Sequence, residues 1–364
     1  MTDKEYSYWL HTIPGIGRKK TCLLLEKYGT AKEVFYAKED TLETLAGIRK
    51  ADVKNIIASR DTERIHAAYE KLQKNDIHFI LAKEQEFPDS LRTIYDPPLA
   101  LYYRGTFPAS GQKSIAIVGA RDCSAYGREI AKYLGRELGK AGFQIISGLA
   151  RGVDVAGHQG ALESSSYTCA VMGCGIDICT PLSNLDVYLK ILKQGGILSE
   201  YGVGIEGRAG FFPERNRIIA GLCDGIIVVE ARKKSGSLIS AELALEQGRD
   251  VFAVPGRIGD GLSEGCNKLI QQGAYALTSY KDILEYYKVE LSYKKRGGEQ
   301  EGVRFLQAEK IVYACLDLLP KHIDRIAGEC KITVAEAMHI LMVLERENLV
   351  RQEIPCYFSR IYKE

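Results

Sequence analysis

Short apolar runs alternate with amphipathic stretches through the middle of the chain. The apolar runs are four or five residues long, rich in β-branched residues, and lie at 114–118, 143–146, 168–172, 196–199, 225–229 and 250–254. Runs of this length and composition are typical of strands buried on both faces of a parallel sheet. After the first run, Ile130, Leu134 and Leu138 recur four residues apart, which predicts a helix with one apolar face over 126–141. The alternation of such strands and helices predicts an α/β fold.

The first 75 residues have a different pattern. Helical periodicity predicts short helices there, at 4–10, 19–28, 32–37 and 51–74. Between them stand IPGIG at 13–17 and LAGI at 45–48, apolar-glycine turns that resemble helix-hairpin-helix motifs. The amides of such hairpins can hold a DNA phosphate without reading sequence. The same turns also suit tight connections in a small bundle that contacts the rest of the protein, so both interpretations stand.

The pattern divides the chain into five segments. After the helical bundle at 1–75, the proline-bearing residues 76–110 predict a connector that adds an edge strand to the sheet. Residues 111–290 predict an extended Rossmann-like core with a parallel sheet, and the charged, glycine-bearing residues 291–302 predict a flexible linker. Residues 303–364 predict helices followed by a β-ribbon, a pattern that resembles a winged helix.

Composition and charge exclude several classes of protein. The net charge is only +2, so a nucleic-acid site must be a local cluster of arginines. No apolar run approaches the roughly 20 residues of a membrane span, and the first residues lack the apolar core of a signal peptide. We therefore expect a cytoplasmic protein with no membrane contact. The 10 cysteines include no CxxC pair, which predicts neither disulfides nor a metal site.

Four loops that follow predicted strands carry the candidate chemistry. Their residues are Gly119 and Arg121 in the first, Ser147, Gly148 and Arg151 in the second, Phe212, Arg215, Asn216 and Arg217 in the third, and Ser235, Gly236 and Ser237 in the fourth. In a doubly wound sheet, ligands bind beyond the carboxyl ends of the strands, where the amides at helix N-termini favour anions. The sequence therefore predicts a phosphate-binding groove at this edge of the sheet.

Arginines dominate this predicted groove. Arg215 and Arg217 stand in the first turn of a predicted helix, where basic side chains oppose the helix dipole, so an anionic partner is indicated. Pairing with acids such as Glu214 or Asp224 is the alternative. We expect Arg121, Arg151, Arg215 and Arg217 to converge on the groove and Phe212 to stack on a base. For the fourth loop, a solvated charge run with a serine N-cap is an equal alternative.

Catalytic patterns are sparse in this sequence. It has no nucleophile-base pair, no metal-ligand spacing and no Walker lysine, and GARDCSAYG at 119–127 lacks the later glycines of a dinucleotide fingerprint. His158 follows Arg151 in a predicted helix, where a structural histidine is favoured, and Asp154 is placed to orient Arg151. The sequence therefore predicts no catalytic residue, no metal and no cofactor.

Taken together, the core motifs resemble the DNA-processing protein A family (DprA, also called Smf). The matching segments include GARDCSAYG, SGLARGVDVAGHQGAL, SEYGVG, FPERNRIIAGL, VVEARKKSGSLISAELALEQGRDVFAVPG and GCNKLIQQGA, in order along the core. The resemblance implies a protein that binds single-stranded DNA and helps to load RecA recombinase on incoming strands during natural transformation. It also implies a homodimer formed through the Rossmann-like domain.

Two other classes of protein compete with this hypothesis. A Rossmann-like nucleotide-binding or nucleotide-hydrolysing enzyme, related to phosphoribohydrolases, would fit the fold. Its PGGxGT turn followed by a glutamate is absent, and SGSLISAE at 235–242 resembles it only distantly. A pure interaction scaffold would leave the arginine-bearing loops without a role.

Overall fold

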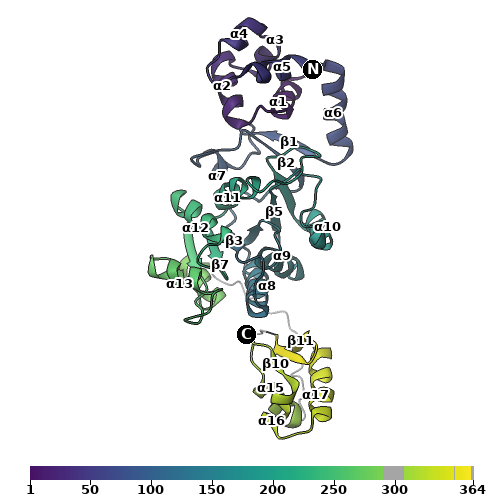
Figure 1. The fold of residues 1–364 in the computed structure, drawn as a ribbon, viewed down its shortest axis with the longest axis vertical. Helices are drawn as coiled ribbons and strands as arrows, with labels where there is room; N and C mark the ends of the chain where they lie inside the picture. Colours follow the sequence, from purple (N-terminus) through teal and green to yellow (C-terminus); the bar gives the residue numbers. More distant parts are fainter. Residues whose placement is uncertain (290–306, 348, 362–364) are drawn as a thin grey trace.

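The computed structural model describes residues 1–289, 307–347 and 349–361, and its parts follow one another along the long axis of the molecule (Figure 1). The N-terminal part is a bundle of α1 (Asp3–Thr12), α2 (Arg18–Tyr28), α3 (Ala31–Tyr36), α4 (Glu39–Glu43), α5 (Lys50–Ala58) and α6 (Thr62–Lys74). The prediction of one helix over 51–74 is wrong, because the chain breaks at Ser59 and restarts with Asp61 as the N-cap of α6. The Ser59 hydroxyl and carbonyl accept hydrogen bonds from the Trp9 indole, at 2.8 and 3.1 Å, so the break is held by a tertiary contact.

Each apolar-glycine turn of the bundle lies against a helix of the other hairpin. Gly15 has a φ of 80° and Gly47 a φ of 91°, a conformation that favours glycine. Asn55 Nδ2 donates to the Pro14 carbonyl at 2.9 Å, and Lys20 Nζ bonds Asp52 at 2.6 Å, so side chains of each helical hairpin hold the other.

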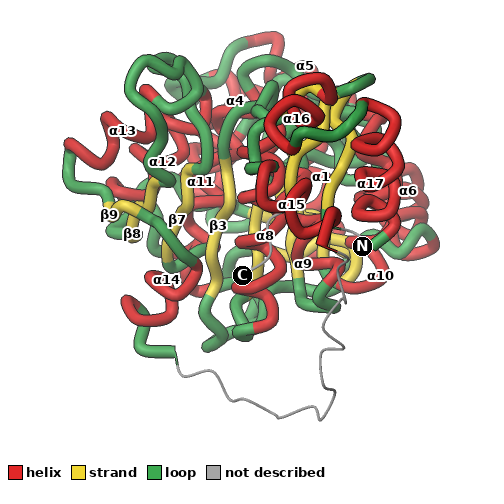
Figure 2. Tube along the Cα trace, turned by 90° about the horizontal axis from the view of Figure 1, so that it is seen from below, coloured by secondary structure: helices red, strands yellow, loops and turns green. Residues whose placement is uncertain are grey.

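The described central residues form a nine-stranded sheet in the order β1-β2-β6-β5-β4-β3-β7-β8-β9. The strands are β1 (His78–Leu81), β2 (Ala100–Gly105), β3 (Ser114–Val118), β4 (Gln144–Ser147), β5 (Thr168–Met172), β6 (Gly196–Ser199), β7 (Gly225–Val228), β8 (Asp250–Ala253) and β9 (Tyr275–Ala276). The pairs from β6 to β9 are parallel, and β1 and β2 are joined antiparallel to that edge. Figure 2 shows β9, β8, β7 and β3 side by side. The predicted α/β class and its parallel strands are confirmed.

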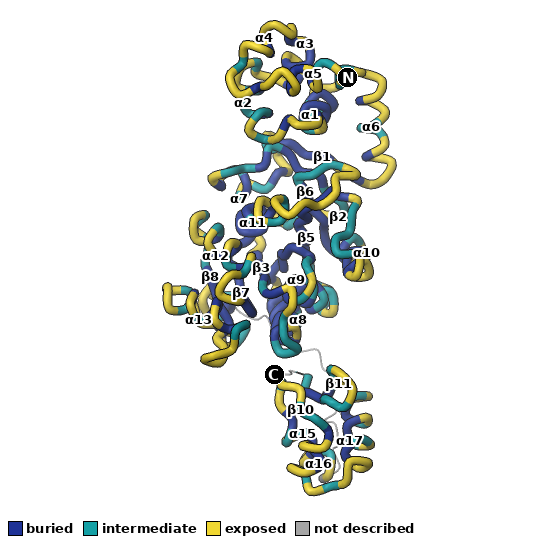
Figure 3. The backbone as a smooth tube through the Cα atoms, in the orientation of Figure 1, coloured by how far each residue is buried: buried dark blue, intermediate teal, exposed yellow. Residues whose placement is uncertain are grey.

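Helices cover both faces of the sheet. One face carries α8 (Ala125–Lys140), α9 (Val153–Glu163), α10 (Leu185–Gln194) and α14 (Tyr280–Tyr286), and the other carries α7 (Asp89–Arg92), α11 (Phe211–Leu222), α12 (Gly236–Glu246) and α13 (Glu264–Gln271). In β3, Ile115 and Ile117 pack on the first face, and Ala116 and Val118 pack on the second. This double burial explains the continuous apolar run at 114–118. Figure 3 shows the strands of the sheet as buried and places most exposed residues on loops and on outer parts of the helices.

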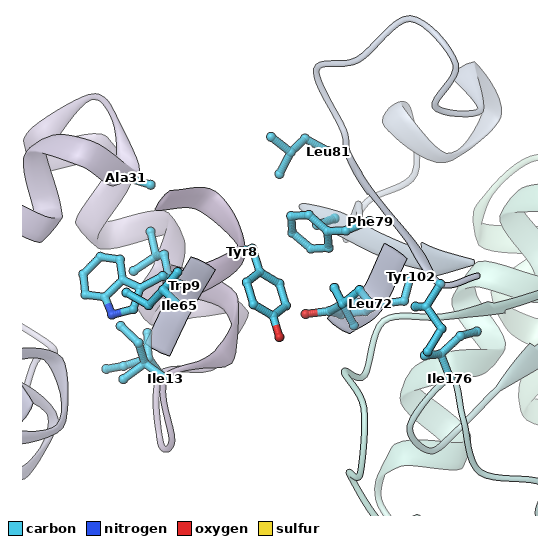
Figure 4. Packing of buried hydrophobic residues seen from close by; sticks show 14 of the residues in the cluster. Tyr8, Trp9, Ile13, Ala31, Ile65, Leu72, Phe79, Leu81, Tyr102 and Ile176 are labelled. Atoms are coloured by element: carbon cyan, nitrogen blue, oxygen red, sulfur yellow. The ribbon is translucent and has the colours of Figure 1, made fainter. Parts of the chain in front are cut away.

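The N-terminal bundle shares an apolar core with the edge of the sheet. Tyr8 of α1 lies between the bundle and the strands, with its ring centroid 5.7 Å from that of Phe79 and 6.4 Å from that of Tyr102 (Figure 4). The same buried cluster continues to Trp9 on one side and Ile176 on the other. Residues 78–105 therefore contribute strands to the sheet and a platform for the bundle.

The C-terminal part has its own core. It contains α15 (Gln307–Cys315), β10 (Lys321–His322), α16 (Ile323–Cys330), α17 (Val334–Arg346), β11 (Val350–Ile354) and β12 (Tyr357–Arg360), with strand order β10-β12-β11 among the described residues. The predicted helices and β-ribbon are present, and the predicted linker at 291–302 lies outside the described residues. Arg351 in β11 joins this part to α8, because it pairs with Glu129 at 2.6 Å and also with Glu353 at 2.7 Å. Across the described ranges, no helix is long and apolar enough to cross a membrane.

Candidate nucleic-acid interface

A pocket of about 410 Å³ opens at the carboxyl edge of β3 and β7. Its wall comes from the loop between β3 and α8, the loop between β4 and α9, the first turns of α11, and the loop before α12. Of the predicted site residues, those that line it are Gly119, Arg121, Phe212, Arg215, Asn216, Ser235, Gly236 and Ser237. The pocket thus lies where parallel strands give way to helix N-termini, as the sequence pattern predicts.

Close backbone packing shapes the first loop. A Cβ on Gly119 would lie 2.7 Å from Val153 Cγ2, and one on Gly152, whose φ is 80°, would overlap the Ala120 carbonyl. The carboxylate of Glu230 accepts a hydrogen bond from the Ser124 amide at 2.8 Å and so fixes the turn into α8. These contacts leave no room for side chains inside the turn.

Arg121 projects from this loop into solvent at the pocket mouth. Its guanidinium carbon lies 5.4 Å from the centroid of the Phe212 ring, a cation–π arrangement. Atoms of the Phe212 ring also pack near Gly173 and Gly207. The exposed Arg121 guanidinium therefore lies against the Phe212 ring at the pocket mouth.

Asp154 and Arg215 hold the loop between β4 and α9 through hydrogen bonds to its backbone. Asp154 accepts from the amides of Gly148 at 3.2 Å and Ala150 at 3.4 Å. Burial raises the pKa of this carboxyl group, and the charge of Arg215 opposes that effect. The expectation that Asp154 orients Arg151 is wrong, because Asp154 Oδ2 accepts from the backbone of its own loop and the ion-pair partner of Arg151 is Asp122. Arg151 is exposed and lies 3.5 Å from Asp122, a residue of the pocket wall.

Arg215 is part of the pocket wall and also part of the core. It is 5% exposed, and its Nη1 donates to the carbonyls of Gly148, at 2.9 Å, and Val171. Burial lowers the pKa of this guanidinium to about 10. A Cβ on Gly148 would lie 2.5 Å from Arg215 Nη2, so glycine is required for this approach. Ser147 is fully buried and donates to the Ile117 carbonyl at 2.6 Å, which ties β4 to β3.

Arg217 does not reach the pocket. Successive helical residues are about 100° apart, so Arg217 lies on nearly the opposite side of α11 from Arg215. There it is 8% exposed and bonds Asp96 at 3.0 Å and Glu200 at 2.7 Å. The expected convergence of all four arginines is therefore wrong for Arg217. The alternative, that the arginine pairs with acidic side chains, is correct for Arg217. The acids are Asp96 and Glu200, however, and not Glu214 or Asp224.

The loop before α12 completes the wall. Ser235 is the N-cap of α12 and accepts from the Ser237 amide at 3.3 Å, while Arg232 and Lys234 line the same pocket. The sequence interpretation missed Ser240, which also lines the pocket. Its spacing of four residues from Gly236 was the available signal, since such residues share one face of a helix.

His158 is structural and gives a prediction about acid stability. It is fully buried, and because the Thr168 hydroxyl donates to the Ile145 carbonyl, His158 Nδ1–H donates to Thr168 Oγ1 at 2.7 Å. Burial and the charge of Arg215 lower the pKa of His158 to about 3. The unfolded chain, with a histidine pKa near 6.5, then binds the proton more readily. The contribution of His158 to the free energy of unfolding is therefore fully present above about pH 6.5. It is lost as the pH falls from about 6.5 toward 3.

We expect this histidine alone to remove about 2 kcal/mol of stability between pH 7 and pH 5. Urea unfolding at both pH values measures the loss, which should be smaller in His158→Asn and unchanged in His339→Asn, an exposed control. Equal losses in the parent and in His158→Asn would contradict the assignment.

Comparisons with known proteins place the chain in a family. The family model of DNA recombination-mediator protein A matches residues 78–288. DNA processing protein DprA of Bacillus subtilis is 38% identical over 280 residues, 75% of this chain and 93% of that protein. Its Streptococcus pneumoniae counterpart is 45% identical over 206 residues, 56% of this chain and 71% of that protein.

Solved structures of related proteins are also similar. The X-ray structure of DprA from Streptococcus pneumoniae superposes with a TM-score of 0.66 at 35% identity, covering 78% of this chain and 98% of that one. DNA processing protein A from Helicobacter pylori, whose structure concerns its single-stranded DNA binding mode, superposes with a TM-score of 0.53 at 31% identity, covering 58% and 95%. This chain therefore belongs to the DNA recombination-mediator protein A family, whose members include the DNA-processing proteins called DprA and Smf.

Proposed function

We propose that this chain binds single-stranded DNA at the pocket on the carboxyl edge of its sheet. The observation that carries the proposal is the exposed Arg121 guanidinium, layered on Phe212 at the mouth of a pocket built from strand-to-helix loops. The single-stranded DNA binding of the Helicobacter pylori relative supports it. Arginines and helix N-terminal amides bind phosphates without contacting the base edges. The affinity is therefore expected to depend on salt concentration and little on base sequence.

The residues divide into two groups under this proposal. Arg121, Asn216 and the Ser235–Ser237 turn contact the strand, and Arg151 adds charge beside the mouth. Gly119, Ser147, Gly148 and Arg215 form and stiffen the loops that present these groups. Phe212 supports Arg121 and becomes available for base stacking when that side chain moves aside.

We also propose that the protein passes its bound strand to RecA recombinase during natural transformation and acts as a homodimer through the Rossmann-like core. Family membership supports both points. A binding role is favoured over nucleotide hydrolysis because the pocket's buried carboxylate, Asp154, already accepts two backbone amides and faces Arg215.

Binding to matched single-stranded and duplex DNA tests the proposal. We expect the single strand to bind at least about tenfold more tightly, because a recessed pocket reaches a free backbone and unstacked bases, and stacking contributes about 1–3 kcal/mol per base. Fluorescence anisotropy over a salt series measures both affinities. Equal affinity for a blunt duplex at the same salt concentration would refute a single-strand site.

A further inference from the structure

Two cysteine side chains are in contact in the C-terminal part of the protein, outside the proposed DNA site. All 10 cysteines of the chain lie in the described ranges and are free thiols. Cys315 is the last residue of α15 and Cys330 is the last residue of α16, and Figure 1 shows these two helices side by side. Both cysteines are half-buried, so small molecules in solution can reach them.

The two sulfur atoms lie at the same turn of α15. Cys330 Sγ donates to the Ile311 carbonyl at 3.9 Å. That carbonyl stands four residues before Cys315 and is therefore the one that accepts from the Cys315 amide in an α-helix. The Cys315 thiol also makes a hydrogen bond with the Cys330 thiol. The two thiols are therefore close together in the folded chain, which is the first requirement for a disulfide.

Charged side chains surround the Cys315 sulfur. Its thiol donates to Glu329 Oε2 at 3.0 Å, and Lys321 Nζ lies 3.7 Å from the sulfur. Burial, Glu329 and Cys330 raise the pKa of the Cys315 thiol to about 12, and the charge of Lys321 opposes them. Cys315 therefore keeps its proton at neutral pH, and Cys330 is the sulfur that reacts first with an oxidant. When Cys315 reacts in its turn, Glu329 can take up its proton and Lys321 can stabilise the thiolate.

We propose that Cys315 and Cys330 are a redox-sensitive pair, which hydrogen peroxide converts into a disulfide that joins α15 to α16. The Cys330 sulfur attacks one peroxide oxygen, so an S–O bond forms and the O–O bond breaks. This sulfur is oxidised to a sulfenic acid, and the other oxygen leaves as water with the thiol proton. The Cys315 sulfur then attacks the sulfenic sulfur, so the S–S bond forms and the S–O bond breaks. The hydroxide leaves as water with the Cys315 proton.

The balance is closed in both directions. Two thiols and one peroxide give one disulfide and two waters. A low-molecular-weight thiol reverses the step by exchange, because two of its molecules are oxidised to their own disulfide as Cys315 and Cys330 are reduced.

The crosslink also stabilises the C-terminal part. Lys321 lies between the two cysteines in the chain, where it donates to the Cys315 carbonyl and pairs with Glu329 at 2.8 Å. Its strand, β10, pairs with β12. A disulfide closes this loop covalently and lowers the entropy of the unfolded chain. The oxidised form is therefore expected to open less often than the reduced form.

Peptide mapping of the full chain without reductant tests the proposal. We expect one equivalent of hydrogen peroxide to give a linked pair of peptides that contain Cys315 and Cys330, and dithiothreitol to restore both thiols. Cys315→Ser should abolish the link and leave on Cys330 a sulfenic acid that dimedone traps. Cys356→Ser removes another half-buried cysteine of the C-terminal part and is the matched control, which should form the link as the parent does.

Proteolysis measures the structural consequence of the link. Thermolysin should cleave the C-terminal part of the linked form at least about tenfold more slowly than that of the reduced form. In Cys315→Ser, treatment with peroxide should leave the cleavage rate unchanged. Absence of the linked peptides, oxidation of Cys22 and Cys356 as fast as the pair, or equal cleavage of the linked and reduced forms would overturn the proposal.

Discussion

Arg121→Ala is expected to weaken single-stranded DNA binding by roughly tenfold or more. The side chain is exposed at the pocket mouth, and its guanidinium contacts the Phe212 ring rather than an acid. Its charge is therefore available to a phosphate, and hydrogen bonds to charged groups contribute about 1.5 to 3 kcal/mol. Loss of one phosphate contact should also reduce the slope of log affinity against log salt by about one.

The control for this variant removes the same charge elsewhere. Arg64 is exposed on α6, in the N-terminal bundle, and Arg64→Ala should bind DNA within about twofold of the parent if the pocket is the site. Thermal unfolding of both variants checks that the tight turn at Gly119 is intact. If Arg121→Ala folds normally and binds strands as the parent does across the salt series, the strand lies elsewhere on the protein.

Arg217→Met is expected to destabilise the fold while leaving DNA affinity unchanged. The substitution removes the cation that Asp96 and Glu200 share, and their side chains are 36% and 20% exposed. Removing one partner of a buried pair typically costs about 3 to 5 kcal/mol. Because Asp96 keeps contact with solvent, we expect about 2 to 3 kcal/mol. For a domain of this size the loss corresponds to a fall in Tm of roughly 4–12 °C.

An exposed ion pair provides the comparison. Lys190→Met breaks the pair with Asp186 on α10, whose side chains are 59% and 76% exposed, and should cost less than about 0.5 kcal/mol. Calorimetric unfolding measures both variants, and strand binding is measured well below the transition. Should Arg217→Met unfold at the parent temperature but lose DNA binding, Arg217 would be a DNA contact after all.

The sequence by itself determined the strands and the class of fold. Residues 114–118 are apolar at every position but the first, and a short β-branched run of this kind is typical of a strand covered on both faces. The glycines at 119 and 148 likewise marked turns in which the backbone and neighbouring side chains pack too closely for a Cβ. The edge of the sheet at which we propose that DNA binds followed from these elements, because strand-to-helix loops of parallel units meet on one side.

Only the tertiary structure decided which polar groups share that edge. Arg215 and Arg217 have the same chemistry and stand two residues apart, yet one lines the pocket and the other bonds Asp96, 121 residues away in the chain. The break after α5 depends on Trp9, fifty residues earlier, and the role of Asp154 depends on how its own loop folds back. Local periodicity indicates which side chains are buried, because the residues on one face of a helix or strand pack together against the core. The partner of a charged group can come from a segment that is far away in the sequence and meets it only when the core folds. The local sequence pattern therefore does not indicate which residue that partner is.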